Sequence, residues 1–491
     1  MRKKSFLWIL CMAVGSNLTG CKKETGETQV FPTIRIAVNS YQGRIEDLNE
    51  VSEAMSEWTE KEIGCSVELL WKSSRMSSKY SYFSQKENAD IFFLGSKEEF
   101  KEYGQKEMLL DMEPLISDYG KGILEVMGCA KEDLIRYGGI YGIPKPLHEI
   151  YSAGIMIAKE YAEKYEMDLS QIHHMEDMEP FLEVIQKKEP EVIPIVSNVA
   201  GNLITRSDPI GDRLDSCIAI VRYDDPELKV ENYYATEEYE ERIRMIRRWQ
   251  QKGYIDPEAM LQIEVGEDLV SSGMAFATEF VIRPDEVQYA KNRYGDQVQI
   301  IPFDEKPHYN RESDWGFLWA ISSSTPYPKE AMKMLNLMYS DQTINDFLLY
   351  GIEGKHYIVN EDGTFSYPEG IDSTNVGYFN DSKWAFNRTI ASRWEGTSEN
   401  IQQEMENFNQ SAITSYADGF SFENSAVEEE MKKVKMVLNQ YTQKFGVGVL
   451  DIDTHYPEFL KQLEKAGAKN ILDEVQRQLD QWKNNKKEEK K

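Results

Sequence analysis

Cysteine and positive charge are both in short supply in this sequence. Only five of its 491 residues are cysteines. Two of them, Cys11 and Cys21, lie close to the N-terminus, and the other three are too few and too scattered for a disulfide framework. Lysine and arginine number 56 against 84 aspartates and glutamates, which gives a formal net charge of -28. Because so acidic a chain repels nucleic-acid phosphates and anionic lipid headgroups, we expect no nucleic acid among its partners.

The sequence motifs of several enzyme classes are also missing. The chain contains no H-E-x-x-H, G-x-S-x-G, G-x-G-x-x-G or G-x-x-x-x-G-K-[ST] sequence. Its six histidines are dispersed, apart from His173 and His174, whose adjacent positions do not suit one face of a helix. The 84 carboxylates do not define an acid and base pair, because a glycosidase needs two at a set separation. We therefore expect no catalytic residues, no metal site and no cofactor.

Long apolar runs are absent, but the N-terminus resembles an export signal. Phe6 to Val14 form a short apolar run that follows a basic stub and falls well below the ~20 residues that span a bilayer. Leu18-Thr19-Gly20-Cys21 comes next and resembles the bacterial lipobox, which implies cleavage before Cys21 and lipidation of its sulfur. An ordinary signal peptide with a chance cysteine is the alternative. We expect residues 1–20 to be a lipoprotein signal peptide and residues 21–31 to be a polar tether.

The first part of the folded chain alternates strands with helices. The apolar periods predict a strand at 34–38, a helix at 45–58, and strands at 67–71 and 89–95. This order indicates a parallel sheet with right-handed crossovers. Ligands of such sheets bind beyond the carboxyl ends of the strands. We therefore expect one rim of a binding site at 39–43, 71–74 and 95–97.

The later part of the chain contains a hinge-like segment and a helical end. Residues 139–146 read as a crossing strand stiffened by two prolines, Pro144 and Pro146. Apolar residues between Val427 and Phe445 recur at 4-3-4-3-4 spacing, which predicts a helix. Residues 483–491 contain no apolar residue, which predicts a frayed, disordered tail.

The order of these segments resembles the extracellular solute-binding proteins of carbohydrate ABC importers (family 1), and in particular the large lipoprotein group named after LplA. The resemblance rests on the lipobox-like residues 18–21, the hinge-like 141–144, the helix start at 327–331, the stretch Tyr-Gly-Ile-Glu-Gly-Lys-His-Tyr at 350–357, and pieces of 419–479. Together these cover most of residues 18–482. The sequence departs from the group's pattern at residues 71–76, which leaves the ligand open.

The resemblance implies an α/β fold, the two-lobed type II periplasmic-binding fold with a helical C-terminal region. One lobe would hold residues 31–146 and 314–350, and the other 147–313 and 351–482. A solute, expected to be an oligosaccharide, would close the cleft between the lobes, and the closed form would dock on ABC permease transmembrane subunits. The protein would be a monomer on the cell membrane, lipid-anchored and facing the extracellular side. The alternatives are the same fold binding a peptide or another polar solute, a secreted lipoprotein hydrolase, and a surface adhesion or sensing protein.

The candidate contacts follow from the chemistry of sugars. A sugar presents an apolar ring face and a belt of hydroxyls, so its sites combine aromatic rings with carboxylates, amides and guanidinium groups. Side chains of these kinds occur at the predicted strand ends and beside the hinge. The candidate substrate-binding residues are Tyr41, Trp71, Ser96, His148, Tyr151, Glu279, Trp315, Tyr357 and Trp384.

Overall fold

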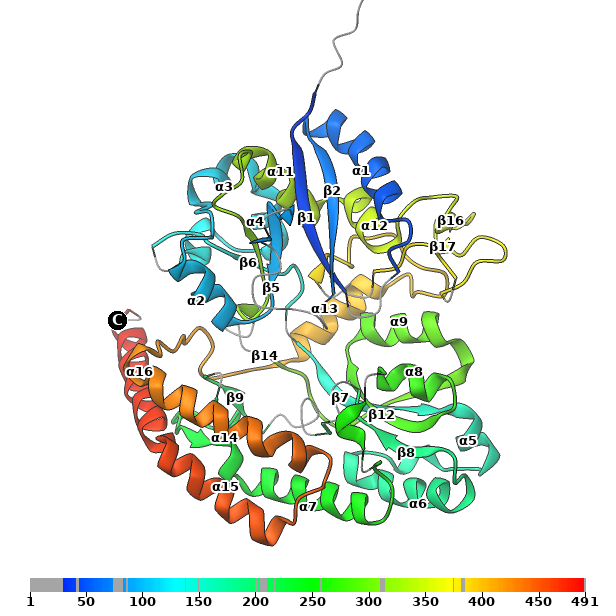
Figure 1. Cartoon of the computed structure of the whole chain (residues 1–491), viewed down its shortest axis with the longest axis vertical. Helices are drawn as coiled ribbons and strands as arrows, with labels where there is room; N and C mark the ends of the chain where they lie inside the picture. The colour runs from blue at the N-terminus through cyan, green and yellow to red at the C-terminus, as the bar shows by residue number, and fades with distance from the viewer. Residues whose placement is uncertain are drawn as a thin grey trace, which may run out of the picture.

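The computed structural model contains two α/β bodies, one above the other in Figure 1. The residues that it describes are 30–40, 44–73, 83–84, 87–136, 138–148, 150–198, 202–203, 210–215, 217–256, 258–262, 264–309, 314–373, 375–380 and 385–489. The predicted signal peptide, most of the tether, and the site candidates Cys21, Tyr41 and Trp384 lie outside the described residues.

The first body is built on a five-stranded sheet with the strand order β2-β1-β5-β15-β6. Its strands are β1 (Thr33–Ser40), β2 (Ser66–Ser73), β5 (Ile91–Leu94), β6 (Ile143–Pro144) and β15 (Leu318–Ile321). β1 pairs in parallel with β2 and β5, whereas β15 runs antiparallel to both β5 and β6. The predicted parallel trio is therefore confirmed, and β15 is the strand by which the chain returns to this body. A short antiparallel pair, β3 (Phe83–Ser84) and β4 (Glu87–Asn88), precedes β5.

Helices cover this sheet. They are α1 (Leu48–Glu62), α2 (Lys97–Gln105), α3 (Glu113–Tyr119), α4 (Lys121–Met127), α11 (Pro328–Ser340) and α12 (Gln342–Tyr350). α1 forms because Val51 and Met55 lie one turn apart and bury the same face. Gly64 ends this region with φ +74°, a left-handed conformation that glycine adopts without a steric penalty.

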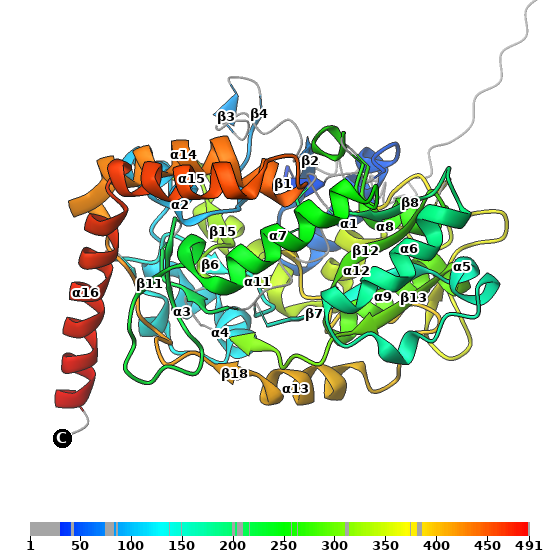
Figure 2. The ribbon, with the colours of Figure 1, turned by 90° about the horizontal axis from the view of Figure 1, so that it is seen from below.

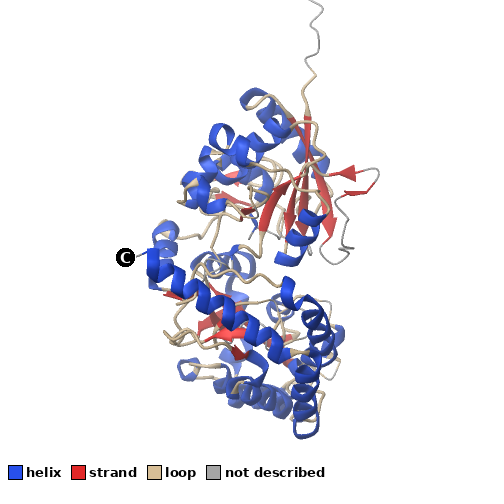
Figure 3. Ribbon diagram, turned by 90° about the vertical axis from the view of Figure 1, so that its left-hand side faces the viewer, coloured by secondary structure: helices blue, strands red, loops and turns tan. Residues whose placement is uncertain are grey.

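The second body holds two smaller sheets. Its four-stranded sheet has the order β13-β7-β12-β8, and its three-stranded sheet has the order β11-β10-β9. The strands are β7 (Ser152–Ala158), β8 (Ile193–Val196), β9 (Asp212–Arg213), β10 (Ala219–Val221), β11 (Glu231–Asn232), β12 (Ala275–Ile282) and β13 (Val298–Pro302). In Figure 3 the strands of each body are enclosed by helices, so each body has its own layered core.

Helices complete the second body. They are α5 (Lys159–Lys164), α6 (Glu179–Lys188), α7 (Glu237–Gln251), α8 (Gly266–Ser271), α9 (Pro284–Tyr294), α14 (Glu428–Gly446), α15 (Ile452–Ala466) and α16 (Ala468–Glu489). The predicted apolar period of α14 is confirmed, since Met431, Val434, Leu438 and Phe445 are all buried. Figure 2 shows α14 and α15 side by side, with α16 turned across their ends.

Two later segments of the chain differ from the sequence-based expectation. The residues from 483 to 489 continue α16 instead of fraying, because lysine and glutamate are good helix formers and cations stabilise the C-terminal end of a helix. The sequence analysis assigns residues 351–482 to the second lobe, whereas Tyr378 and Phe386 of this segment belong to the core of the first body. Tyr378 Oη donates to the Leu348 carbonyl at 2.9 Å, which ties this segment to α12.

The chain passes between the bodies near residues 144–152, 303–318 and 401–417. Two of these passages meet, because β14 (His308–Tyr309) pairs in parallel with β18 (Ile413–Thr414). α13 (Ile401–Ser411) leads into the second of them, and the hairpin of β16 (Ile358–Val359) and β17 (Phe365–Ser366) lies earlier in the chain. Paired crossing segments of this kind are suited to hinge motion between two bodies.

Candidate ligand-binding cleft

A cavity of about 530 Å³ lies between the two bodies, where α2 faces α14. We call it the Trp315 cavity. The first body contributes Ser96, Phe100, Lys101, Arg136, Trp315 and Phe317, and the second contributes Arg213, Asp215, Phe422 and Asn424. A cavity of this size matches the range of small-molecule sites. Because its walls belong to different bodies, any relative motion of the bodies changes its shape.

Ser96 sits at the rim of this cavity, directly after β5, as the sequence predicted. Its hydroxyl accepts a hydrogen bond from the Glu99 backbone N–H at 3.1 Å and so caps α2. Glu99 Oε2 in turn accepts from the Gly95 N–H at 2.8 Å. These reciprocal bonds fix the loop between strand and helix, so the rim is held in one conformation.

Trp315 also lines the cavity, but Arg136 covers part of its ring. The guanidinium carbon of Arg136 lies 4.1 Å from the ring centroid, and Trp315 is only 7% exposed. Arg136 Nη1 donates to the backbone carbonyls of Asp133 and Ile135 at 3.1 and 2.9 Å, which holds the side chain over the indole. The surface offered to a ligand is therefore a stacked guanidinium and indole, a cation–π pair, and not a bare aromatic face.

The opposite wall carries a carboxylate with one unused oxygen. Asp215 Oδ1 accepts three backbone N–H groups, from Cys217, Ile218 and Ala219, at 3.1, 2.9 and 2.8 Å. Asp215 Oδ2 is buried and has no hydrogen-bond partner in the described part of the chain. Burial raises the pKa of this carboxyl group above its usual value, despite the three N–H donors. Arg213 lies beside it, stacked 3.9 Å above the Tyr233 ring.

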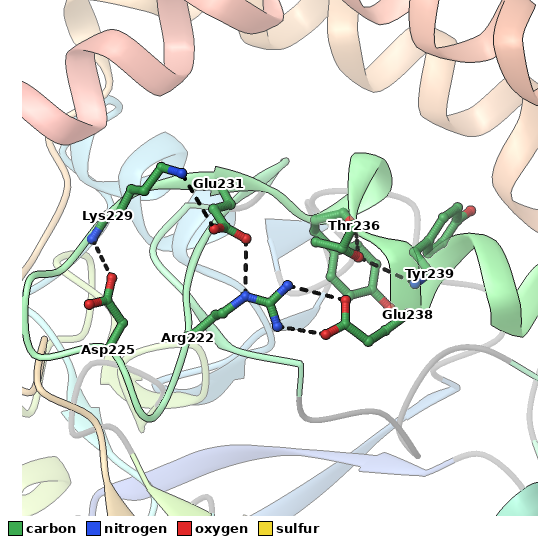
Figure 4. A network of polar contacts seen from close by, with 8 residues as sticks. Arg222, Asp225, Lys229, Glu231, Thr236, Glu238 and Tyr239 are labelled. Atoms are coloured by element: carbon green, nitrogen blue, oxygen red, sulfur yellow. Dashed lines mark hydrogen bonds and ion pairs between the residues drawn. The ribbon is translucent and has the colours of Figure 1, made fainter.

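A polar network joins the three-stranded sheet to α7 (Figure 4). Arg222 donates from Nε to Glu231 Oε2 at 3.2 Å and from Nη1 to Glu238 Oε1 at 2.6 Å, which ties the three-stranded sheet to α7. Thr236 caps α7 by accepting from the Tyr239 N–H at 3.3 Å. These bonds hold the three-stranded sheet against α7, and strand β9 of that sheet ends two residues before Asp215.

The predicted residues His148 and Tyr151 lie in the first crossing segment. His148 Nδ1 lies 2.8 Å from Asp314 Oδ2, and the Tyr309 hydroxyl donates to the same oxygen at 3.1 Å. Tyr151 forms an isolated antiparallel bridge with His308 and is 39% exposed. His148 and Tyr151 thus each lie beside a residue of another crossing segment.

A second cavity, of about 450 Å³, lies between α9 and the first body. We call it the Tyr289 cavity. α9 contributes Asp285, Gln288, Tyr289, Asn292 and Arg293, which share one helix face, and the other body contributes Tyr350, Tyr367, Phe379, Arg388 and Trp394. The rings of Tyr350 and Tyr367 lie 5.5 and 4.7 Å from the Trp394 ring. Burial raises the pKa of Tyr367 to about 12, so its hydroxyl stays protonated at neutral pH.

Three other predicted residues occupy different environments. Trp71 is half-buried near the carboxyl end of β2, opposite Val38 of β1. Glu279 is 6% exposed in the centre of β12, opposite Ile155 of β7. Tyr357 is 8% exposed and stacks on Phe365 with ring centroids 4.0 Å apart, so it packs within an aromatic cluster.

Sequence reasoning missed most of the residues that line the two cavities. The α9 stripe at 285, 288, 289, 292 and 293 could have been found, because polar and aromatic residues recur there at helical spacing. Arg136, Asp215 and Arg388 carry no such signal, since each reaches its cavity through long-range packing. Ser96 and Trp315 were predicted because they adjoin apolar strands.

The described residues offer neither a metal site nor a membrane span. Within these ranges no group of three or more His, Cys, Asp or Glu side chains is placed to hold a metal ion. No described helix combines the length and the apolar character that crossing a bilayer requires.

Comparison with known proteins relates the chain to solute-binding proteins. Residues 416–484 match a family described as "Domain of unknown function (DUF3502)". A carbohydrate ABC transporter substrate-binding protein of Streptococcus pneumoniae serotype 4 is 24% identical over 494 residues, which is 97% of this chain and 96% of the relative.

Crystal structures share the fold. N-glycan transport solute binding protein (NgtS) from Streptococcus pneumoniae, in complex with Man1GlcNAc, has a TM-score of 0.76 at 21% identity. The superposition covers 92% of this chain and 99% of the NgtS chain. Its complex with Man5GlcNAc has a TM-score of 0.74 at 21% identity, with coverages of 93% and 99%. The predicted two-lobed α/β fold is therefore confirmed. The resemblance of this chain to the substrate-binding proteins of carbohydrate ABC transporters, inferred from its sequence, is confirmed with it.

Proposed function

We propose that this chain is an extracellular substrate-binding protein that captures an oligosaccharide between its two lobes and delivers it to the transmembrane subunits of an ABC permease. The observation that carries the proposal is the Trp315 cavity, whose walls come from both lobes and combine aromatic rings, guanidinium groups and a carboxylate. These are the groups that recognise the apolar face and the hydroxyls of a sugar. The solved relatives were crystallised with Man1GlcNAc and Man5GlcNAc, which supports a glycan as the ligand class.

Contacts across the cleft support closure around the ligand. Lys435 Nζ on α14 lies 2.8 Å from Glu98 Oε1 on α2. Lys101 Nζ on α2 donates to Asn424 Oδ1 at 2.5 Å, before α14. Because both contacts join the lobes at the mouth of the Trp315 cavity, they favour the closed arrangement. A ligand then needs to supply only a few kcal/mol of differential affinity to shift the hinge equilibrium.

Calorimetric titration and thermal shift with a panel of ligands test the binding role. The panel contains mannose-containing N-glycan fragments, plant oligosaccharides and mixed peptides. We expect a glycan to raise the melting temperature, with a stabilisation of about 2.7 kcal/mol at a hundredfold excess over Kd. Peptides that stabilise the protein while every glycan leaves it unchanged would establish the peptide alternative. Release of shorter glycans during incubation would instead indicate a hydrolase.

The location and the partners form part of the same proposal. Leu18 to Cys21 support lipidation at Cys21. The lipid would hold the two-lobed protein, as a monomer, on the outer side of the cell membrane next to its permease. Replacing Cys21 by serine should move the protein from the membrane fraction to the medium. Protease treatment of intact cells should digest the wild-type protein if it faces outward. Retention of the Cys21→Ser protein in the membrane fraction would contradict the anchor.

A further inference from the structure

The Tyr289 cavity combines an apolar aromatic lining with a buried arginine. The rings of Tyr289, Tyr350, Tyr367 and Trp394 provide apolar surface on several sides. Arg388 lines the same cavity, and its side chain is only 8% exposed. The guanidinium therefore sits where water is largely excluded and where each hydrogen bond counts for more than at the surface.

The charge of Arg388 is already balanced. Its Nη2 lies 2.6 Å from Asp285 Oδ2 and 3.0 Å from Glu286 Oε1. Asp285 also accepts from Arg283 at 2.6 and 2.9 Å, so two guanidinium groups face two carboxylates. Arg293, the α9 cation that lines this cavity, pairs with Asp268 at 2.9 Å. An additional carboxylate or phosphate beside Arg388 or Arg293 would find no unbalanced cation in these two pairs, which disfavours an anionic group at this part of the cavity. Arg393 also lines the cavity.

Two donor atoms of Arg388 nevertheless remain unused. Nε and Nη1 are buried, and the described residues supply no hydrogen-bond partner for either atom. A buried N–H donor without an acceptor destabilises the folded protein, because it has lost its hydrogen bonds to water. A neutral oxygen can accept these hydrogen bonds without adding charge. The acceptor must also come with apolar surface, because several aromatic rings line the cavity around Arg388. An acetamido group meets both requirements, since it presents a carbonyl oxygen next to a methyl group.

We propose that the Tyr289 cavity is a subsite for an N-acetylated sugar unit, with the acetamido carbonyl accepting from Arg388 and the methyl group against the Tyr289 and Trp394 rings. The inference rests on the proposed function, because it assigns one unit of a bound oligosaccharide to one end of the cleft. The two cavities would read opposite hydrogen-bonding groups, because Arg388 offers donors in one and Asp215 Oδ2 is an acceptor in the other.

Two disaccharides that differ only in the acetamido group test the inference. Titration calorimetry compares mannosyl-N-acetylglucosamine with mannosyl-glucose of the same linkage on the wild-type protein. We expect the N-acetylated disaccharide to bind at least about tenfold more tightly, the ratio that one good hydrogen bond in a dry site provides. Equal affinity, or binding only of glycans without an N-acetylated unit, would overturn the inference while leaving the binding function intact. If the protein binds no glycan at all, the proposed function fails as well.

A variant then tests whether Arg388 is the residue responsible. Arg388→Lys keeps the positive charge beside Asp285 and Glu286 but removes the Nε and Nη1 donors. We expect the preference for the acetamido ligand to fall to about threefold or less, with smaller change for mannosyl-glucose. Arg244→Lys is the matched control, because Arg244 pairs with Glu240 and Asp453 on the far side of the second lobe. Unchanged preference in a folded Arg388→Lys protein would refute the assignment. If that variant does not fold, Trp394→Leu, which leaves Arg388 in place, should still reduce the preference by removing the methyl contact.

Discussion

Arg388 and Asp285 form an ion pair between the two lobes that is almost closed to solvent. Arg388 Nη2 lies 2.6 Å from Asp285 Oδ2, and the two side chains are 8% and 9% exposed. Asp285 lies in the first turn of α9, where a carboxylate also interacts favourably with the helix dipole. Burial raises the pKa of Asp285, but Arg388 and Arg283 outweigh burial and hold the pKa below its usual value.

Removing Arg388 should therefore destabilise the protein strongly. Arg388→Ala removes one of the two guanidinium groups that face Asp285 and Glu286 in a dry environment, so we expect a loss of about 3 kcal/mol in the free energy of unfolding. Urea denaturation followed by circular dichroism measures it. Arg244→Ala is the control, since the Arg244 side chain is 44% exposed. Losing its ion pairs should lower the free energy of unfolding by less than about 1 kcal/mol. Equal effects of the two substitutions would contradict the buried role of Arg388.

Asp346 should make the protein less stable as the pH rises from about 4 to 6. Burial raises the pKa of Asp346 to about 6 in the folded protein, although Ser392 donates to it from its N–H and its hydroxyl, both at 2.7 Å. The unfolded chain releases this proton near pH 3.8. Ionisation between these two values therefore favours the unfolded state, by about 3 kcal/mol in total.

Asp346→Asn removes this penalty while keeping an oxygen for the Ser392 N–H. We expect the variant to exceed wild type in stability at pH 7.5 by up to about 3 kcal/mol and to match it near pH 4.

Glu179 offers a control in which stability should change with pH in the opposite direction. Burial raises its pKa, but hydrogen bonds from Arg248, Lys252 and Trp249 outweigh burial and lower it to about 2. Glu179→Gln should thus lose stability at neutral pH and recover relative to wild type in acid. Denaturation at both pH values decides each case.

The elements of this fold were easier to predict than its contacts. The apolar residues of α14 repeat along one face, so the sequence around Met431 and Val434 carries the helix signal locally. Ser96 and Trp315 were identified because they adjoin strands whose ends meet at the sheet edge. Arg388 and Asp285 come together only through the packing of two lobes, and no local sequence pattern predicts such a pair. Tyr357 suggested a sugar contact by its type, yet its ring stacks on Phe365 inside an aromatic cluster.

Glu98 and Lys435 should influence ligand affinity through lobe closure. They face each other across the cleft at 2.8 Å and are 46% and 36% exposed, so the pair contributes only about 0.2–1 kcal/mol. Lys435→Glu replaces attraction by repulsion, and we expect it to weaken glycan binding about threefold in low salt. The charge-swapped protein Glu98→Lys, Lys435→Glu is the matched control and should regain the wild-type affinity. Calorimetry at low and high ionic strength checks both. Weakening that persists in the swapped protein would show that the loss does not arise from this pair.

Asp215 should act as a hydrogen-bond acceptor for the ligand. Its Oδ1 is held by three backbone N–H groups, whereas Oδ2 is buried and without a partner among the described residues of the Trp315 cavity. Asp215→Asn preserves the shape and the Oδ1 bonds but turns the second position into a donor. We expect glycan affinity to fall about tenfold, with little change in the melting temperature.

The same carboxylate should make binding depend on pH. Because burial raises its pKa above 3.8, protonation in mild acid converts the acceptor into a donor, so wild-type affinity should decline as the pH falls toward this pKa. Asp215→Asn has no such group and should show a flat profile over the same range. Asp225→Asn is the matched control (Figure 4), because both Asp225 oxygens accept backbone N–H groups, from Glu227 and Lys229 at 2.8 Å, in an exposed loop. A profile of Asp215→Asn that parallels the wild type would remove Asp215 from the binding site, since the titrating group would then lie elsewhere.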